Sequence, residues 1–254
     1  MFYNWKYLRP SFFNTILLLM VIMGMNSCTK SDPTDCFKST GKETTVIRSS
    51  GVFDKINLHD NVNLVITQSS SNSISVKGGK NLLKKVKTDI NDGELTIENQ
   101  NSCNWMRSFD KEITVYVNVN QLHEIEYNGS GDISCTNTII SDSLKLNVWE
   151  GAGNVDIKVE TERNFIYFHI GTADINYSGV CHLSYITLSS FGPIKAENLQ
   201  STFTYIANNG SNNCYIHADT RIEANIGGLG DIYYRGDPEI IINKTGEGNM
   251  IKMD

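Results

Sequence analysis

Seven short copies of one pattern recur in the second half of this chain, and each has small residues, then Asp or Asn (Pro in one copy), then an apolar residue. They read GSGDI at 129–133, GAGNV at 151–155, GTADI at 171–175, SFGPI at 190–194, GSNNC at 210–214, GLGDI at 228–232 and GEGNM at 246–250. The apolar last position recurs at intervals of 22, 20, 19, 20, 18 and 18 residues. A unit of this length cannot bury its own apolar face, so the repeat predicts a stacked array in which neighbours cover one another.

Short stretches of period-two alternation lie between these copies. Leu144, Leu146 and Val148 alternate with polar residues, as do Ile222, Ala224 and Ile226. Such alternation is typical of half-buried strands. A unit of about 20 residues is too short for a propeller blade of roughly 40 to 45 residues and fits one coil of a β-solenoid.

We therefore expect an all-β fold, a right-handed β-helix-like solenoid, with about seven recognisable coils over residues 127–254. Equivalent apolar positions would then lie above one another in one internal ladder, formed by Ile133, Val155, Ile175, Ile194, Cys214, Ile232 and Met250. A meandering β-sandwich is the competing fold, but its turn signals recur at about 8 to 12 residues. At each corner we expect Gly to supply a positive φ and Asp or Asn to close an Asx-turn.

Residues 41–126 are also strand-rich but lack the repeat. Asp92-Gly93 between Ile90 and Leu95 is a strong hairpin signal. One short helix is expected over residues 81–87, with Asn81 as its N-cap. No linker-like sequence separates the two halves, so 41–254 is predicted to be a single elongated β domain.

The amino end carries a targeting segment at residues 1–27. Lys6 and Arg9 precede a largely apolar run over 12–25 that is short for a membrane span of about 20 residues. Residues 25–28, Met-Asn-Ser-Cys, resemble a bacterial lipoprotein box, which implies lipid attachment at Cys28. The alternatives are an ordinary cleaved signal or an uncleaved anchor, with Cys28 unmodified. The polar residues 28–40 are predicted to be a flexible tether.

The charge balance bears on possible partners. The chain has 22 basic and 28 acidic residues, and removal of 1–27 takes away two basic residues, which leaves 20 against 28, or −8. This argues against nucleic acid as a partner, since its binders cluster Lys and Arg. Membrane attachment would come from acyl chains, and the expected location is the cell envelope, as an outer-membrane lipoprotein that is periplasmic or surface-exposed.

Cysteine usage leaves five thiols if Cys28 carries lipid. Cys36 and Cys103 both lie in polar, irregular sequence, and we predict a disulfide between them, which the envelope permits. Cys214 occupies a ladder position and is expected to be a buried thiol. The state of Cys135 and Cys181 stays open.

Catalytic motifs are absent from the sequence. It contains no H-E-x-x-H, no G-x-S-x-G and no Walker loop, and it predicts no enzyme activity and no cofactor. Calcium bound by Asp132, Asp174 and Asp231 is a weak alternative to a purely structural role for these carboxylates. A polysaccharide-active β-helix enzyme also stays an alternative, because scattered acids and strand aromatics are available.

Two resemblances follow from particular residues. Asp142-Ser143-Leu144 resembles the O-glycosylation site of Bacteroidetes, which makes Ser143 a candidate modification site. The segments at 52–68 and 78–99, together with NGSGDI at 128–133 and the later corners, resemble the head GIN domain family, labelled an autotransporter adhesin and common in Bacteroidetes lipoproteins. The resemblance implies an all-β, solenoid-like envelope protein and brings no catalytic residues.

The sequence thus predicts a lipid-anchored, adhesin-like binding module without catalytic activity. Its partner would be a glycan or another envelope protein. A self-associating structural protein of the envelope, a homo-oligomer joined at an open solenoid end, is a further alternative.

Overall fold

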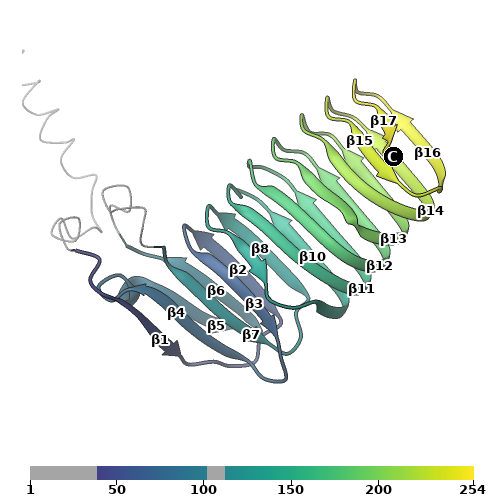
Figure 1. Cartoon of the computed structure of the whole chain (residues 1–254). Coiled ribbons are helices and arrows are strands. Elements are labelled where there is room, and N and C mark those ends of the chain that lie inside the picture. Colours follow the sequence, from purple (N-terminus) through teal and green to yellow (C-terminus); the bar gives the residue numbers. More distant parts are fainter. Residues whose placement is uncertain (1–38, 102–111) are drawn as a thin grey trace, which may run out of the picture. The chain divides into compact units, whose positions relative to one another are not determined.

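The computed structural model describes residues 39–101 and 112–254, and its strands form one continuous 17-stranded sheet that coils into a solenoid of about 6 turns (Figure 1). The first strands are β1 (Glu43–Arg48), β2 (Lys55–Asp60), β3 (Asn63–Gln68), β4 (Ser73–Gly79), β5 (Val86–Asn91), β6 (Glu94–Asn99), β7 (Thr114–Val119) and β8 (Glu124–Gly129). The later strands are β9 (Ile133–Cys135), β10 (Ile139–Val148), β11 (Asn154–Phe168), β12 (Asp174–Leu188), β13 (Ile194–Asn208), β14 (Cys214–Ile226), β15 (Ile232–Arg235), β16 (Glu239–Lys244) and β17 (Met250–Lys252). No helix in these ranges is long and apolar enough to span a bilayer.

The predicted solenoid and its internal ladder are confirmed. Strands β9, β11 to β15 and β17 pair in parallel so that the seven apolar corner positions lie in register, from Ile133 beside Val155 to Ile232 beside Met250. The ladder continues into the first half, because Leu64 of β3 pairs with Ile133 and also with Val115 of β7. The Gly-Asx corners therefore lie above one another, and we call this line of corners the seam.

Each full coil consists of one long strand that bends at its middle. In β11, inward and outward positions alternate until Glu162 and Arg163, which are both exposed between buried Thr161 and Asn164. Two consecutive outward residues reverse the alternation, and we call this corner, opposite the seam, the bend. β14 pairs with β15 through its first part and with β16 through its second, which divides the coil into a first limb and a second limb.

The first half joins the same stack through parallel pairing. β2 pairs with β8 and β6, and β3 pairs with β9 and β7. Antiparallel strands then complete this end, where β4 pairs with β7 and β1, and β5 pairs with β6.

Two local predictions for the first half had different outcomes. The hairpin is confirmed, since Ile90 pairs with Leu95 and the turn residues Asp92 and Gly93 have φ of 49° and 80°. The expected helix is only a 3-10 turn, Leu83–Lys85, and Asn81 is not its N-cap. The Asn81 amide instead donates a hydrogen bond to the Ser39 carbonyl oxygen at 2.9 Å, so the side chain ties down the preceding segment.

The reason predicted for the corner glycines was wrong. Among the glycines of the seam, only Gly171 has a φ in the left-handed region, at 137°. The others are needed for space, because a Cβ at Gly153 would lie 2.6 Å from the Gly131 carbonyl oxygen of the preceding coil. Coils stacked at strand spacing leave no room for a side chain where the backbone turns.

The interior is filled by aliphatic side chains from both limbs, with a polar patch at the bend. Ile157, Ile166 and Ile186 are each 1% exposed or less. The buried polar side chains at the bend are Thr161, Asn164, Ser184, Ser201 and Thr204. Ser201 and Thr204 bond to each other at 2.6 Å, whereas the hydroxyls of Thr161 and Ser184 and the Asn164 amide have no partner among the described residues.

Candidate functional site

The Asp and Asn side chains of the seam link successive coils. Asp132 Oδ1 accepts the backbone N–H of Asn154 at 2.8 Å, and the Asp132 N–H donates to Asn63 Oδ1 of the preceding coil at 2.9 Å. The same arrangement returns at the other end, where Asp231 Oδ1 accepts from the Asn249 N–H at 2.7 Å. The predicted Asx-turn within one corner is therefore replaced by a ladder between corners.

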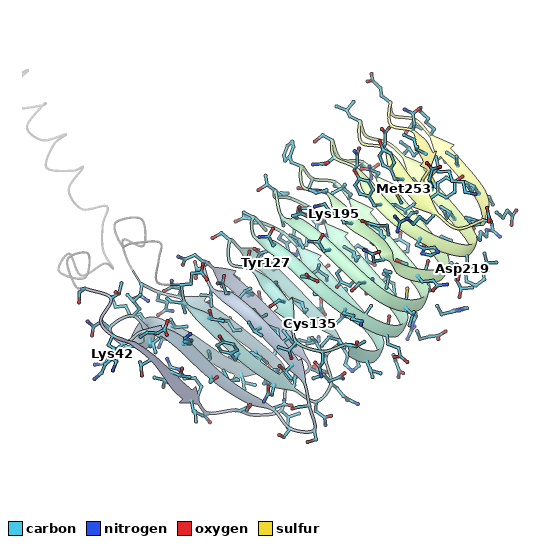
Figure 2. All side chains as sticks on the ribbon, viewed as in Figure 1. Lys42, Tyr127, Cys135, Lys195, Asp219 and Met253 are labelled. Atoms are coloured by element: carbon cyan, nitrogen blue, oxygen red, sulfur yellow. The ribbon has the colours of Figure 1, made fainter. Side chains whose placement is uncertain are left out.

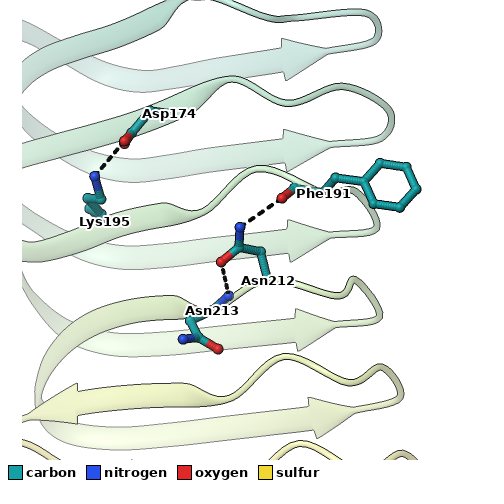
Figure 3. A network of polar contacts seen from close by, with 5 residues as sticks. All are labelled: Asp174, Phe191, Lys195, Asn212 and Asn213. Carbon is teal, nitrogen blue, oxygen red and sulfur yellow. Dashed lines mark hydrogen bonds and ion pairs between the residues drawn. The ribbon is translucent and has the colours of Figure 1, made fainter.

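The ladder is interrupted where the fourth copy has Pro in place of Asp or Asn. There Asp174 forms an ion pair with Lys195 Nζ at 2.5 Å, and Asn212 Nδ2 donates to the Phe191 carbonyl oxygen at 2.8 Å (Figure 3). Asn212 Oδ1 also accepts the Asn213 N–H at 2.8 Å. The irregular corner is thus held by other side chains, and Lys195 is a seam residue that the repeat pattern did not single out.

These contacts bear on the calcium alternative. Asp132 and Asp231 each use Oδ1 for the next coil, and Asp174 already faces a lysine ammonium group. Within residues 39–101 and 112–254, no cluster of three or more His, Cys, Asp or Glu side chains is placed to hold a metal ion. The seam carboxylates have a structural task that requires no metal.

Two buried polar side chains form hydrogen bonds to the backbone of the seam from inside the solenoid. The hydroxyl of Tyr127, labelled in Figure 2, donates to the Gly131 carbonyl oxygen at 2.7 Å and accepts the Gly153 N–H at 2.9 Å. Asn208 does the same several coils later, with Nδ2 on the Asn212 carbonyl oxygen at 3.0 Å and Oδ1 on the Gly210 N–H at 3.1 Å. Both side chains point inward, Tyr127 from near the end of β8 and Asn208 from the last residue of β13. Their polarity hid this inward position in the sequence.

Among the residues that the structure describes, the largest group of neighbouring aromatic rings lies on the outer surface of the second limb, and we call it the aromatic face. It comprises Trp149, Phe165, Tyr167, His169, Tyr185 and Tyr205. Parallel pairing creates this group, because Phe165, Tyr185 and Tyr205 occupy the same outward position on β11, β12 and β13. Tyr167 near the end of β11 and His169, which directly follows that strand, extend it sideways.

The rings contact one another and remain open to solvent. Trp149 stacks on His169 with centroids 3.8 Å apart, and the centroids of Tyr185 and Tyr205 are 6.4 Å apart. Partial burial in this group lowers the pKa of His169, so its imidazole stays neutral at neutral pH. Trp149 is 44% exposed and Tyr185 39%. Ring stacking stabilises the coils, and the exposed edges and faces leave an apolar contact surface.

The remaining predicted site residues are spread over the molecule. Ser143 lies half-exposed in β10, where its carbonyl oxygen accepts a hydrogen bond from Ser141 Oγ at 3.0 Å. Cys28, Cys36 and Cys103 lie outside the described residues, so lipid attachment and the disulfide stay predictions.

The described cysteines are free thiols. Cys214 is fully buried as expected, and Cys181 is also buried. Burial raises the pKa of the Cys181 thiol to about 12 and also raises the pKa of Cys214. Cys135, half-buried, accepts the Lys158 N–H at 3.1 Å, and burial raises its pKa too. All three are therefore protonated at neutral pH and poor nucleophiles.

A stacked parallel seam and an aromatic outer face define a β-solenoid protein. The chain belongs to the family described as "Putative auto-transporter adhesin, head GIN domain", whose profile matches residues 52–238. No curated protein sequence matches the chain.

Several crystal structures share this fold. A "putative adhesin" from Bacteroides fragilis is 23% identical, with a TM-score of 0.76 over 84% of this chain and 97% of that one. A "putative lipid binding protein" from Parabacteroides distasonis is 20% identical, with a TM-score of 0.66 over 85% and 98%. A "putative adhesin" from Parabacteroides merdae is also 20% identical, with a TM-score of 0.63 over 85% and 98%.

Proposed function

We propose that this protein is a lipid-anchored binding module of the bacterial cell envelope that acts without catalysis. Cys28 would carry the acyl chains, residues 28–40 would serve as the tether, and the solenoid would present its side to a partner. The observation that carries the proposal is the aromatic face, an exposed group of stacked rings on a regular β surface.

The chemistry of this face suits a glycan or another envelope protein. Aromatic rings supply large apolar contact area with few rotatable bonds, and they are enriched where proteins bind partners. Two structural neighbours bear the name adhesin and one the name lipid binding protein. Among these chemistries we favour a glycan, because sugar rings have apolar faces that stack on aromatic side chains.

Binding of the full chain, purified in detergent, to immobilised glycans and envelope fractions tests this proposal. Tyr185→Ala with Tyr205→Ala should weaken binding by at least about tenfold if the rings form the contact. Tyr116→Ala is the matched control, because Tyr116 is also 39% exposed but lies on β7, away from the face. Equal loss in both variants, or no binding to any glycan or fraction, would contradict the proposal.

The lipid anchor is tested separately by fractionating cells that express the full chain or Cys28→Ala. Acylation predicts that the chain sediments with membranes and incorporates labelled fatty acid, and that Cys28→Ala does neither. Membrane association that survives Cys28→Ala would favour an uncleaved anchor instead.

Self-association is a second candidate function, favoured by the carboxyl-side end of the stack. In the described part of the chain, β16 pairs only with β14 and β17 only with β15, so each leaves one edge of backbone groups unpaired. Ile241 and Ile242 beside this edge are 44% and 48% exposed. Unpaired edges with exposed apolar residues are templates for pairing with another chain.

A further inference from the structure

Polar side chains line the inside of the bend in three consecutive coils. Thr161 and Asn164 of β11 point inward on either side of the two exposed residues of the bend. Strand pairing aligns Asn164 with Ser184 of β12, and Ser184 with Thr204 of β13. The interior of the solenoid is therefore polar over this short stretch, although most of its lining is aliphatic.

The two inward positions that flank the bend approach each other inside the coil. In β13 they are Ser201 and Thr204, whose hydroxyl groups form a hydrogen bond at 2.6 Å. Thr161 is aligned with Cys181, and Cys181 with Ser201, so Thr161 is the counterpart of Ser201. Asn164 is in the same way the counterpart of Thr204. The register therefore brings the Thr161 hydroxyl and the Asn164 amide toward each other in β11.

The polar groups of β11 and β12 have no partner of the kind that β13 supplies. The Thr161 hydroxyl, both polar atoms of the Asn164 amide and the Ser184 hydroxyl form no hydrogen bond with another described residue. The three side chains are 8%, 0% and 2% exposed, so bulk solvent does not reach them. Buried polar groups without a partner are destabilising, and folded proteins satisfy nearly all of them with protein atoms or ordered water.

The chemistry of these groups selects a small neutral ligand. Hydroxyl and amide groups carry no charge, and the Asn164 column becomes apolar on both sides, at Leu144 of β10 and Ile222 of β14. An Asn amide offers two donors and an oxygen with two lone pairs, more than either neighbouring hydroxyl can satisfy alone. Water both donates and accepts, and a buried water typically forms about three hydrogen bonds to groups of this kind.

We propose that ordered water is bound inside the bend, shared between Thr161, Asn164 and Ser184. The water does for β11 and β12 what the direct bond between Ser201 and Thr204 does for β13. The site lies on the inner side of the sheet behind the aromatic face, because Asn164 and Ser184 each directly precede a ring of that face. It does not depend on what the aromatic face binds.

A high-resolution crystal structure of the full chain in detergent tests the site directly. The proposal expects electron density for a water oxygen within about 3 Å of both Thr161 Oγ1 and a polar atom of the Asn164 amide. A direct hydrogen bond between these two side chains, with no density between them, would overturn the proposal. This test needs no variant, so it holds even if a substitution in the core prevents folding.

The sign of the change in Tm is an independent test. Thr161→Val keeps the shape of the side chain and deletes only the hydroxyl. If that hydroxyl bonds to water, the Tm of the full chain should fall by about 2–4 °C, the loss that corresponds to one hydrogen bond in a domain of this size. If the hydroxyl is buried without any partner, its removal relieves the cost of burying it and the Tm should stay the same or rise.

Thr204→Val is the matched control, because it makes the same substitution at the bend of β13, where Ser201 Oγ is the known partner. It should lower the Tm by a similar amount and so calibrates the loss of one hydrogen bond at this corner. Ser184→Ala should also lower the Tm, since the second coil shares the water. A Thr161→Val variant whose Tm is unchanged or higher, beside a Thr204→Val variant that is destabilised, would overturn the proposal.

Discussion

At the residue scale, the glycines of the seam show how closely the coils approach one another. A Cβ added at Gly131 or Gly230 would fall inside the backbone of the preceding coil, at Val62 and Asn212 respectively. The sequence predicts Gly at a corner from turn chemistry, but turn chemistry acts within one corner. The actual restraint comes from the neighbouring coil, which is 18 residues away in sequence for Gly230 and 69 for Gly131, and local reasoning does not see it.

We predict that Gly153→Ala lowers the free energy of unfolding by about 2 kcal/mol, as expected for overpacking. The new Cβ would lie 2.6 Å from the Gly131 carbonyl oxygen and 2.8 Å from the Tyr127 hydroxyl, so a coil must shift. Gly51→Ala is the control, because a Cβ there meets only Ile90 at 3.6 Å or more. Denaturant unfolding measures both, and a Gly153→Ala variant as stable as Gly51→Ala would contradict this account of the seam.

At the element scale, the Asx ladder adds side-chain hydrogen bonds at the corners to the backbone hydrogen bonds that already link successive coils there, such as that from the Leu229 N–H to the Gly210 carbonyl oxygen. Asn63, Asp132 and Asn154 form one run of the ladder, and Asn213, Asp231 and Asn249 form another. Lys195 and Asp174 lie between them. Each run satisfies backbone N–H groups where the chain turns too sharply for strand pairing.

Asp231 offers a test of this ladder. Asp231→Ala should lower the free energy of unfolding by about 1 kcal/mol, because the Asn249 N–H loses its acceptor, while Asp231→Asn keeps an oxygen there and should be nearly neutral. Thermal unfolding with calcium or with EDTA should give the same Tm for the parent chain. If calcium raises the Tm of the parent chain but not that of Asp231→Asn, a calcium site at the seam would be supported instead.

The elements differ in how far the sequence could predict them. The seam was predictable because its Gly-Asx pattern repeats, and so was the ladder from Ile133 to Met250. The bend was not, because the chain turns at Glu162 and Arg163 without Gly or Pro. Its only signal is a break in alternation, which is easily mistaken for the end of a strand.

The aromatic face was not predictable from the sequence for another reason. Trp149, Tyr167 and Tyr185 each look like ordinary strand residues, and only the pairing of β10, β11 and β12 brings them together. The partner of Ile140 is the Gln68 side chain, 72 residues earlier, which no periodicity indicates. Parallel stacking brings these side chains together through the register of strand pairing. That register depends on the number of residues in each coil.

At the scale of the whole described body, the two ends of the stack differ in kind. At one end the outermost strands are β1 and β5, which pair antiparallel with β4 and β6. At the other end β16 and β17 follow the parallel order of the coils below them. A parallel coil can accept a further coil without changing its register, so this end is the one suited to contact another chain.

If this end mediates self-association, Ile242→Lys should abolish it, because Ile242 lies beside the unpaired edge of β16 and a buried ammonium group there would oppose pairing. Sedimentation velocity of the full chain in detergent should show a concentration-dependent oligomer for the parent chain and a monomer for the variant. Val180→Lys adds the same charge at a residue that is 47% exposed, against 48% for Ile242, but on the first limb of β12, just before its bend. It should leave the oligomer intact, since β12 is paired on both sides. A parent chain that stays monomeric at every concentration would contradict self-association through this end of the stack.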